Sequence, residues 1–259
     1  MAYRVKSNAV WTGLPGTICA YQSIAAPDPF AARQNVAHRG ARFGVYTATP
    51  GVAPTWSAAT GWTFNGTSQY LSSGIIHAST SCSAIVCFRN IANTGTHALY
   101  SSVQTTPLER GIQLTIGTSA TTAYFANGGA TGLETAPRPS SGTMGVSGKT
   151  AYRDGIVNGT IPAGTDMSGL TQYIGAANVD GIAAAFCSGS ILGLLVLERV
   201  LSPAEVWLAS RQMAYCDVNP DWNAWARRRM YFYAPSAAAA AFNPAWARNT
   251  NTLLGGGFD

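Results

Sequence analysis

The acidic side chains are the residues best suited to hydrolytic chemistry. Two carboxylates that flank a bound sugar can act as acid and nucleophile, and alternate positions of one strand would place them on one face. The chain has only four glutamates, Glu109, Glu134, Glu198 and Glu205, and none lies within five residues of another acidic residue. The sequence therefore offers no local pair of carboxylates for this chemistry.

Histidine and cysteine form no metal-binding or nucleophile pattern. His38, His77 and His97 are far apart, and the cysteines are odd in number and lack a CxxC spacing. The cysteines are Cys19, Cys82, Cys87, Cys187 and Cys216. We interpret them as small buried hydrophobes rather than as disulfides or zinc ligands. No GxSxG elbow is present, but a Ser-His-Asp triad assembled by folding stays open.

Three aspartates in the middle of the chain, Asp154, Asp166 and Asp180, are the candidates for calcium. Calcium prefers several carboxylate oxygens together, and these three are widely spread, so we expect turn and loop roles for them. The sequence thus predicts no catalytic residue, no metal site, no cofactor and no enzymatic activity.

Charge is scarce along the chain. Asp, Glu, Lys and Arg make up 10% of its 259 residues, against roughly 25% in ordinary soluble proteins. The net charge of +5 comes almost entirely from arginine, because Lys6 and Lys149 are the only lysines. Arginine favours protein interfaces, and the single basic run, 227–229, is too little to predict a nucleic-acid partner. With no apolar leader or membrane-span stretch, we expect synthesis in the cytoplasm and no membrane partner.

Short apolar runs separated by turn residues, between about residues 60 and 200, predict the fold. Residues 82–88 and 190–197 are apolar on both faces, as in strands that are covered twice. Residues 112–116 alternate apolar and polar side chains, which predicts a half-buried strand. Residues 152–157 predict a hairpin around an Asp154-Gly155 turn. The pattern is typical of an all-β, two-sheet antiparallel sandwich.

Helical signals follow the last of these strands. Ser202 is the expected N-cap, Pro203 the first helical residue, and Glu205 the partner of Ser202 in a capping box. We therefore expect one short helix near 203–215.

The C-terminal segment, residues 217–259, combines prolines with aromatic and arginine side chains. The prolines oppose a compact helical domain, and the aromatic content is high for a disordered tail. We expect an extended arm that docks either on its own domain or on a neighbouring subunit. The expected partner-binding residues of the arm are Trp222, Trp225, Arg227, Arg228, Arg229, Tyr231, Tyr233, Phe242, Trp246 and Arg248.

Five short motifs occur in order along the chain. They are Trp62-Thr-Phe-Asn-Gly-Thr-Ser-Gln-Tyr-Leu71, Tyr152-Arg-Asp-Gly155, Tyr173-Ile-Gly-Ala176, Phe186-Cys-Ser-Gly189 and Leu201-Ser-Pro-Ala-Glu205. Their order and spacing resemble the laminin-G-like, concanavalin A-like jelly roll, over roughly residues 14–216 and after an N-terminal segment, 1–13. The resemblance implies a jelly-roll β-sandwich. Laminarinase-like glycosidases on this scaffold carry an E-x-D-x(x)-E strand, which this chain lacks.

Further segments resemble the version of this domain in proteins of tailed phages. Cys19–Ile24, with Gly51–Trp56 preceding the Trp62 strand, is similar to that version. Asn219-Pro220, Trp225 and Arg227–Phe232 are similar to the tail that follows it. This resemblance implies a structural protein of a phage virion, assembled in the host cytoplasm.

The leading hypothesis is a capsid decoration or cement-type subunit. The sandwich would sit on the shell, and the arm would bind the major capsid protein, other virion proteins or sister subunits. We expect a homo-oligomer; decoration proteins are often trimers, but the sequence itself leaves the number of subunits open.

The alternative is a glycan-binding module of a tail fibre or spike, with loops at the rim of the sandwich as the binding surface. Exposed aromatic side chains would stack on sugar rings, and Trp11, Trp56 and Tyr100 are candidates, although core positions suit them equally. Fibre proteins usually carry a long repetitive or coiled-coil shaft, which this sequence lacks, and this favours the decoration hypothesis.

Overall fold

The computed structural model describes residues 10–37, 46–105, 110–117, 123–126, 131–133, 139–160 and 167–218. The chain divides into two compact units, Met1–Arg228 and Arg229–Asp259, and every described residue belongs to the first. The expected binding residues of the arm, Trp222 to Arg248, lie outside the described residues. The docking of the arm and the predicted domain boundaries therefore stay predictions.

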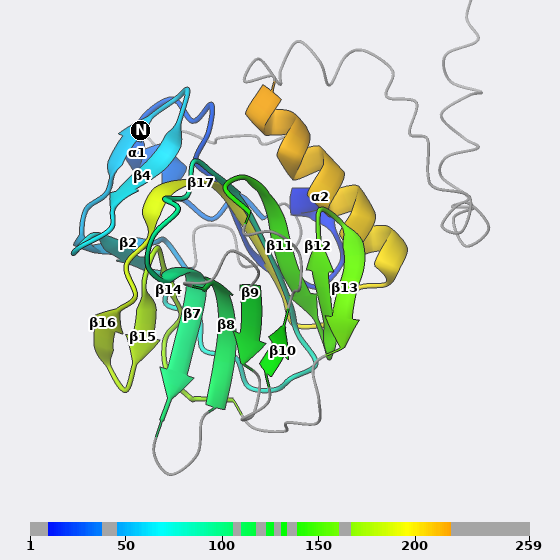
Figure 1. The fold of residues 1–259 in the computed structure, drawn as a ribbon. Helices are drawn as coiled ribbons and strands as arrows, with labels where there is room; N and C mark the ends of the chain where they lie inside the picture. Colours follow the sequence, from blue (N-terminus) through cyan, green and yellow to red (C-terminus); the bar gives the residue numbers. More distant parts are fainter. Residues whose placement is uncertain are drawn as a thin grey trace, which may run out of the picture. The chain divides into compact units, whose positions relative to one another are not determined.

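Two β-sheets form the body of the described chain (Figure 1). Sheet A has the strand order β13-β12-β11-β6-β17-β4-β3, and β1 pairs with β17. Its strands are β1 (Thr17–Gln22), β3 (Thr55–Ser57), β4 (Gly61–Asn65), β6 (Ser83–Arg89), β11 (Gly142–Ser147), β12 (Thr150–Arg153), β13 (Ile156–Thr160) and β17 (Ser188–Leu197). The described pairings of this sheet are all antiparallel.

Sheet B has the strand order β10-β9-β8-β7-β14-β5-β2, and β15 pairs with β7 and with β16. Its strands are β2 (Thr49–Val52), β5 (Tyr70–Ser72), β7 (His97–Gln104), β8 (Arg110–Ile116), β9 (Ala123–Ala126), β10 (Thr131–Leu133), β14 (Tyr173–Ile174), β15 (Ala177–Val179) and β16 (Ile182–Ala184). The β15–β7 pairing is parallel, and the other described pairings are antiparallel. The predicted all-β, two-sheet sandwich is confirmed.

Helices are short or peripheral in the described part of the chain. They are η1 (Val10–Gly13), α1 (Pro29–Ala32) and α2 (Pro203–Val218). The helix expected near 203–215 is confirmed and runs three residues further, whereas η1 and α1 were not predicted. Within the described ranges, no helix has the length and apolar character needed to cross a membrane.

The capping box at the start of α2 is confirmed. The backbone N–H of Glu205 donates to Ser202 Oγ at 3.3 Å, and the backbone N–H of Ser202 donates to Glu205 Oε2 at 2.9 Å. Arg199 adds a two-pronged ion pair, with Nη2 2.6 Å from Glu205 Oε1. These bonds satisfy amide groups that a helix start would leave without partners.

The strands predicted to be covered twice are covered twice. In β6 and β17 nearly every residue is buried, and side chains of both strands belong to the core between the sheets. On the other face, a Cβ at Gly193 would lie 3.4 Å from Met213 of α2 and 3.7 Å from Trp11 of η1. Figure 1 shows α2 lying along the outside of this sheet. Helices thus cover the face that the second sheet does not reach.

The prediction of a half-buried strand at 112–116 is wrong for one face. Ile112, Leu114 and Ile116 belong to the core, as expected. Gln113 and Thr115, on the opposite face, are only 7% and 1% exposed. The alternation shows which side chains are polar, not which are exposed. Polar side chains are also buried where another segment of the chain packs over them.

The hairpin at 152–157 is confirmed. Asp154 and Gly155 have φ values of +51° and +80°, as a two-residue hairpin turn with the twist of the strands requires. A Cβ at Gly155 would lie 2.8 Å from Trp207 Cα, so this position needs glycine for space as well.

His77 is a buried polar residue of the sandwich. Its Nε2 lies 3.0 Å from the hydroxyl of Tyr100, and the two rings meet edge to face at 6.0 Å. Burial lowers the pKa of His77 from its ordinary 6.5 to about 4, because the charged imidazolium would lose its water there.

The first prediction concerns acid stability. Between pH 6.5 and about 4 the unfolded chain binds a proton that folded His77 does not. The free energy of unfolding should therefore fall by roughly 3 kcal/mol as pH drops through this window. Above pH 6.5 His77 is neutral in both states and causes no such loss. Urea unfolding across this range, on wild type and His77→Gln, measures the effect. The variant should start less stable and lose less with acid; equal losses in both proteins would contradict the prediction.

Candidate functional site

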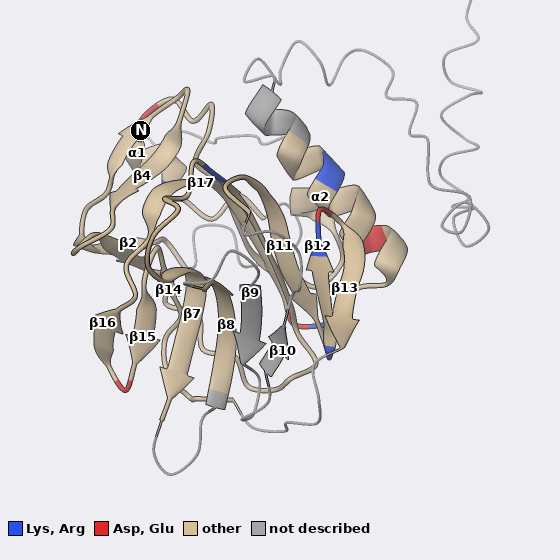
Figure 2. Cartoon of the chain, viewed as in Figure 1, with Lys and Arg blue, Asp and Glu red and all other residues tan. Residues whose placement is uncertain are grey.

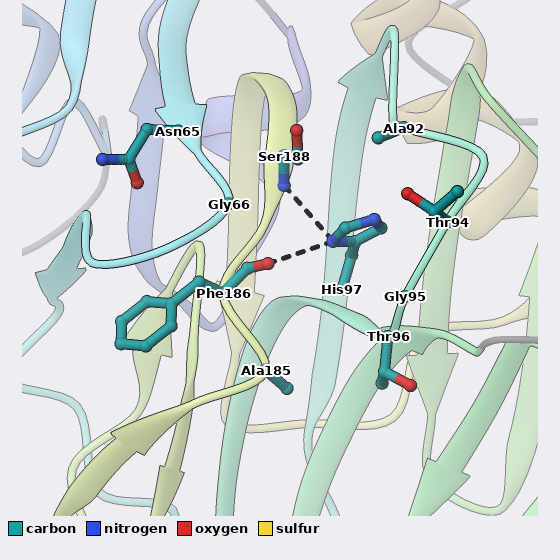
Figure 3. Close-up of a pocket in the computed structure, with 10 residues that line it drawn as sticks. All are labelled: Asn65, Gly66, Ala92, Thr94, Gly95, Thr96, His97, Ala185, Phe186 and Ser188. Carbon is teal, nitrogen blue, oxygen red and sulfur yellow. Dashed lines mark hydrogen bonds between the residues drawn. The ribbon is translucent and has the colours of Figure 1, made fainter.

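An open pocket of about 490 Å³ lies where β4 ends and where β7 and β17 begin. Three stretches form it: the turn after β4, the β6–β7 loop with the first residue of β7, and the segment that enters β17. The described residues that line it are Asn65, Gly66, Ala92, Thr94, Gly95, Thr96, His97, Ala185, Phe186 and Ser188 (Figure 3). Both sheets therefore contribute to this pocket.

The turn after β4 is held by Asn65. Its Oδ1 accepts hydrogen bonds from the three backbone N–H groups of residues 67–69, at 3.0 to 3.3 Å. Gly66 has a φ of +77°, and a Cβ there would lie 2.8 Å from Ser188 Cβ. Glycine thus lets the turn approach the segment that enters β17.

His97 is the buried polar group of the pocket. Its Nδ1 lies 3.0 Å from the carbonyl oxygen of Phe186 and 3.3 Å from the backbone nitrogen of Ser188. A ring with a proton on Nδ1 donates to the carbonyl, and the other tautomer accepts from the Ser188 N–H. In both cases Nε2 has no hydrogen-bond partner, although the residue is only 5% exposed. Figure 3 shows Nε2 on the side of the ring that faces Thr94.

Three half-buried aromatic rings form a cluster beside the pocket. The rings of Tyr70 and Tyr173 lie 4.7 Å apart, and Tyr70 lies 6.4 Å from Phe186, which lines the pocket. Strands β5 and β14 place the two tyrosines next to each other, because Tyr173 pairs with Ser72 in the register. Burial, together with the neighbouring Tyr70, raises the pKa of Tyr173, so its phenol is neutral.

The electrostatic character of the pocket is neutral. None of the described lining residues is an Asp, Glu, Lys or Arg. Figure 2 shows few charged positions over the two sheets as a whole. Phe186 thus contributes apolar surface to the described part of the pocket, and amide, hydroxyl and imidazole groups contribute polar surface.

The aromatic residues predicted for sugar stacking lie elsewhere. Trp11 and Tyr100 are fully buried, and Trp56 is partly buried, packs against the core and donates its Nε1–H to the carbonyl of Ser23 at 2.8 Å. None of the three lines the pocket. The three residues therefore have the core positions that were the alternative to sugar stacking.

Sequence reasoning missed the aromatic residues that do cluster. Tyr70, Tyr173 and Phe186 all stand in the motifs that carry the fold resemblance, which indicates the fold but no binding role for them. In the sequence, His97 is far from the other two histidines and belongs to no motif. The available signal was the place of the three aromatic residues in the short motifs at strand starts and between strands, and it did not specify which rings would meet.

Two of the aspartates weighed for calcium have turn roles, as expected. Asp154 Oδ1 accepts from the backbone N–H of Thr143 at 2.8 Å, and Asp180 accepts from that of Thr105 at 3.1 Å. Asp166 lies outside the described residues. Among the side chains that the structure describes, no group of three or more His, Cys, Asp or Glu could hold a metal ion.

No protein-family model matches the sequence, and no curated protein matches it either. Solved structures do match. A Trypanosoma rangeli sialidase in complex with sialic acid aligns with a TM-score of 0.50 and 14% identity, over 78% of this chain and 34% of that one.

Two further matches are weaker. The NanB sialidase from Streptococcus pneumoniae aligns with a TM-score of 0.43 and 14% identity, over 60% of this chain and 28% of that one. The CBM40 of the Ruminococcus gnavus IT-sialidase, bound to α2,3-sialyllactose, aligns with a TM-score of 0.39 and 16% identity, over 53% and 84%. The chain spans about a third of the length of the sialidases that it matches.

These comparisons correct one prediction. The sequence predicted no enzymatic activity, and this is contradicted, because the T. rangeli structure that shares the fold is a sialidase, which is an enzyme. The missing E-x-D-x(x)-E strand argues only against a laminarinase-like arrangement. At 14% identity the likeness establishes the fold, a β-sandwich.

The interpretation of the cysteines as buried hydrophobes is confirmed for four of them. Cys19, Cys82, Cys87 and Cys187 are free and buried. Burial raises the pKa of Cys82 and of Cys187 to about 12, because a thiolate would lose its water there. The side chain of Cys216 lies outside the described set.

The second prediction concerns thiol reactivity. Iodoacetamide reacts with exposed thiolates, so the four buried cysteines should stay unmodified in the native protein and become alkylated after unfolding in urea. Peptide mass spectrometry measures each site separately. Rapid alkylation of any of the four in the folded chain would show that its burial is wrong.

Proposed function

We propose that this chain is a glycan-binding β-sandwich module and that the pocket at the start of β7 and β17 is its binding site. The observation that carries the proposal is the combination, in one open pocket, of an aromatic ring, uncharged polar groups and a buried imidazole nitrogen without a partner. Small-molecule sites usually combine apolar walls with a few fixed polar groups. Sugars match both, since their rings have an apolar face and their edges carry hydroxyls.

Phe186 supplies the apolar part of the described lining. It is half-buried, and Figure 3 shows its ring on the side away from His97. The ring lies 6.4 Å from that of Tyr70, within an aromatic cluster. A ring supported in this way loses little side-chain freedom when a sugar packs on it. The volume of about 490 Å³ suits one or two sugar rings.

The fold supports the same class of function. The sandwich is shared with a sialidase whose structure contains sialic acid, so this architecture occurs in proteins that handle glycans. The sequence-based decoration hypothesis depends on the C-terminal arm, whose residues lie outside the described ones. A phage origin, a virion location and capsid partners stay predictions, and a glycan-binding module on a virion surface is compatible with them.

The third prediction tests the site. The full-length protein should bind sugars on a glycan array and by titration calorimetry, and Phe186→Ala should weaken binding about tenfold. Phe30→Ala is the matched control, because Phe30 is 62% exposed and does not line the pocket. The control should bind as wild type does. Absence of binding at millimolar sugar, or equal affinities for Phe186→Ala and wild type, would overturn the proposal.

A further inference from the structure

We infer that Nε2 of His97 is the polar anchor of the pocket and that it hydrogen-bonds one hydroxyl of an uncharged sugar; the inference rests on the proposed glycan-binding function. The residue is 5% exposed, and Nε2 makes no hydrogen bond. A buried polar atom without a partner costs free energy, and a bound hydroxyl would remove that cost.

The imidazole is held in place before any sugar binds. Nδ1 contacts the main chain of Phe186 and Ser188. The chain on either side is tied as well, by the hydrogen bond from the Ala98 N–H to the Ala185 carbonyl at 2.9 Å and by that from the Ala92 N–H to the Ser188 carbonyl at 2.8 Å. The imidazole itself therefore needs little further ordering when a ligand uses Nε2, which favours affinity.

A hydroxyl fits Nε2 in either tautomer. If Nδ1 carries the proton, Nε2 accepts a hydrogen bond, and if Nε2 carries it, Nε2 donates one. A sugar hydroxyl can donate or accept, whereas a carboxylate can only accept and an ammonium group can only donate. The ligand group that matches the site in every case is a hydroxyl.

The described lining also points to an uncharged sugar. Its other side-chain polar groups belong to Asn65, Thr94, Thr96 and Ser188, all neutral. A sialic acid would bring its carboxylate against these neutral groups and would lose hydration without gaining an ion pair from them. The ligand class that we infer thus differs from the sialic acid in the T. rangeli structure.

Two substitutions separate the two ring nitrogens. The amide of His97→Asn reaches the position of Nδ1 and removes Nε2, whereas the amide of His97→Gln extends to the position of Nε2. By calorimetry with lactose and with methyl glycosides of glucose, galactose and mannose, His97→Asn should weaken binding about tenfold, and His97→Gln should stay within about threefold of wild type. Equal affinities for His97→Asn and wild type would overturn the anchor.

A deoxy-sugar series gives a readout that a merely structural role would not change. Among monodeoxy analogues of the best-binding glycoside, one should bind wild type about tenfold more weakly than the parent sugar, and His97→Asn should not distinguish that analogue from the parent. If both proteins discriminate among the analogues alike, Nε2 is not the group that contacts a hydroxyl.

The ligand class has its own test. Lactose should bind at least as tightly as α2,3-sialyllactose, which carries the same disaccharide with a sialic acid residue, and so a carboxylate, added; tighter binding of sialyllactose would overturn the uncharged class. If wild type binds none of these sugars, the proposed function fails. If Phe186→Ala weakens binding and His97→Asn does not, only the present inference fails.

Discussion

The burial of both faces of β17 is the constraint on which the rest of the structure depends. This strand pairs with β1, β4 and β6, and eight of its ten residues are buried. Its inner side chains belong to the core between the sheets, and its outer face meets Met213 of α2 and Trp11 of η1. Each buried Å² of apolar surface contributes about 25 cal/mol, so a strand that is apolar on both sides requires a layer on each. The second sheet and α2 are those layers.

The same strand determines where the pocket forms. Residues 185–188 carry the chain from β16 in sheet B into β17 in sheet A. Cys187 is buried, its N–H donates to the Gly175 carbonyl, and its own carbonyl accepts from the Gly66 N–H, both at 2.8 Å. Because neighbouring side chains of extended backbone point to opposite sides, Phe186 and Ser188 face away from the core and line the pocket. The crossover between sheets thus supplies an aromatic ring and main-chain groups to one rim.

Aromatic side chains show how one residue type serves two roles in this fold. Trp11, Trp62 and Tyr100 are fully buried, where their area stabilises the sandwich. Tyr70 and Tyr173 remain half-buried and pack on each other at the surface. A large ring contributes apolar area in either place, so its type does not report which role it has. For this reason sequence reasoning selected Trp11, Trp56 and Tyr100 as candidates for sugar stacking, and it did not select Phe186.

The sequence by itself determined the features that depend on residues close together in the chain. The runs 82–88 and 190–197, the Asp154-Gly155 turn and the capping box of Ser202 and Glu205 are local, because periodicity, turn conformation and capping act over a few residues. Only the tertiary structure decided the site. His97 meets the carbonyl of Phe186 across 89 residues of sequence, and Tyr70 meets Tyr173 because β5 and β14 happen to be neighbours in the sheet. Such contacts follow from the order and register of strands, which are fixed by packing over the whole core and leave no local pattern in the residues that they join.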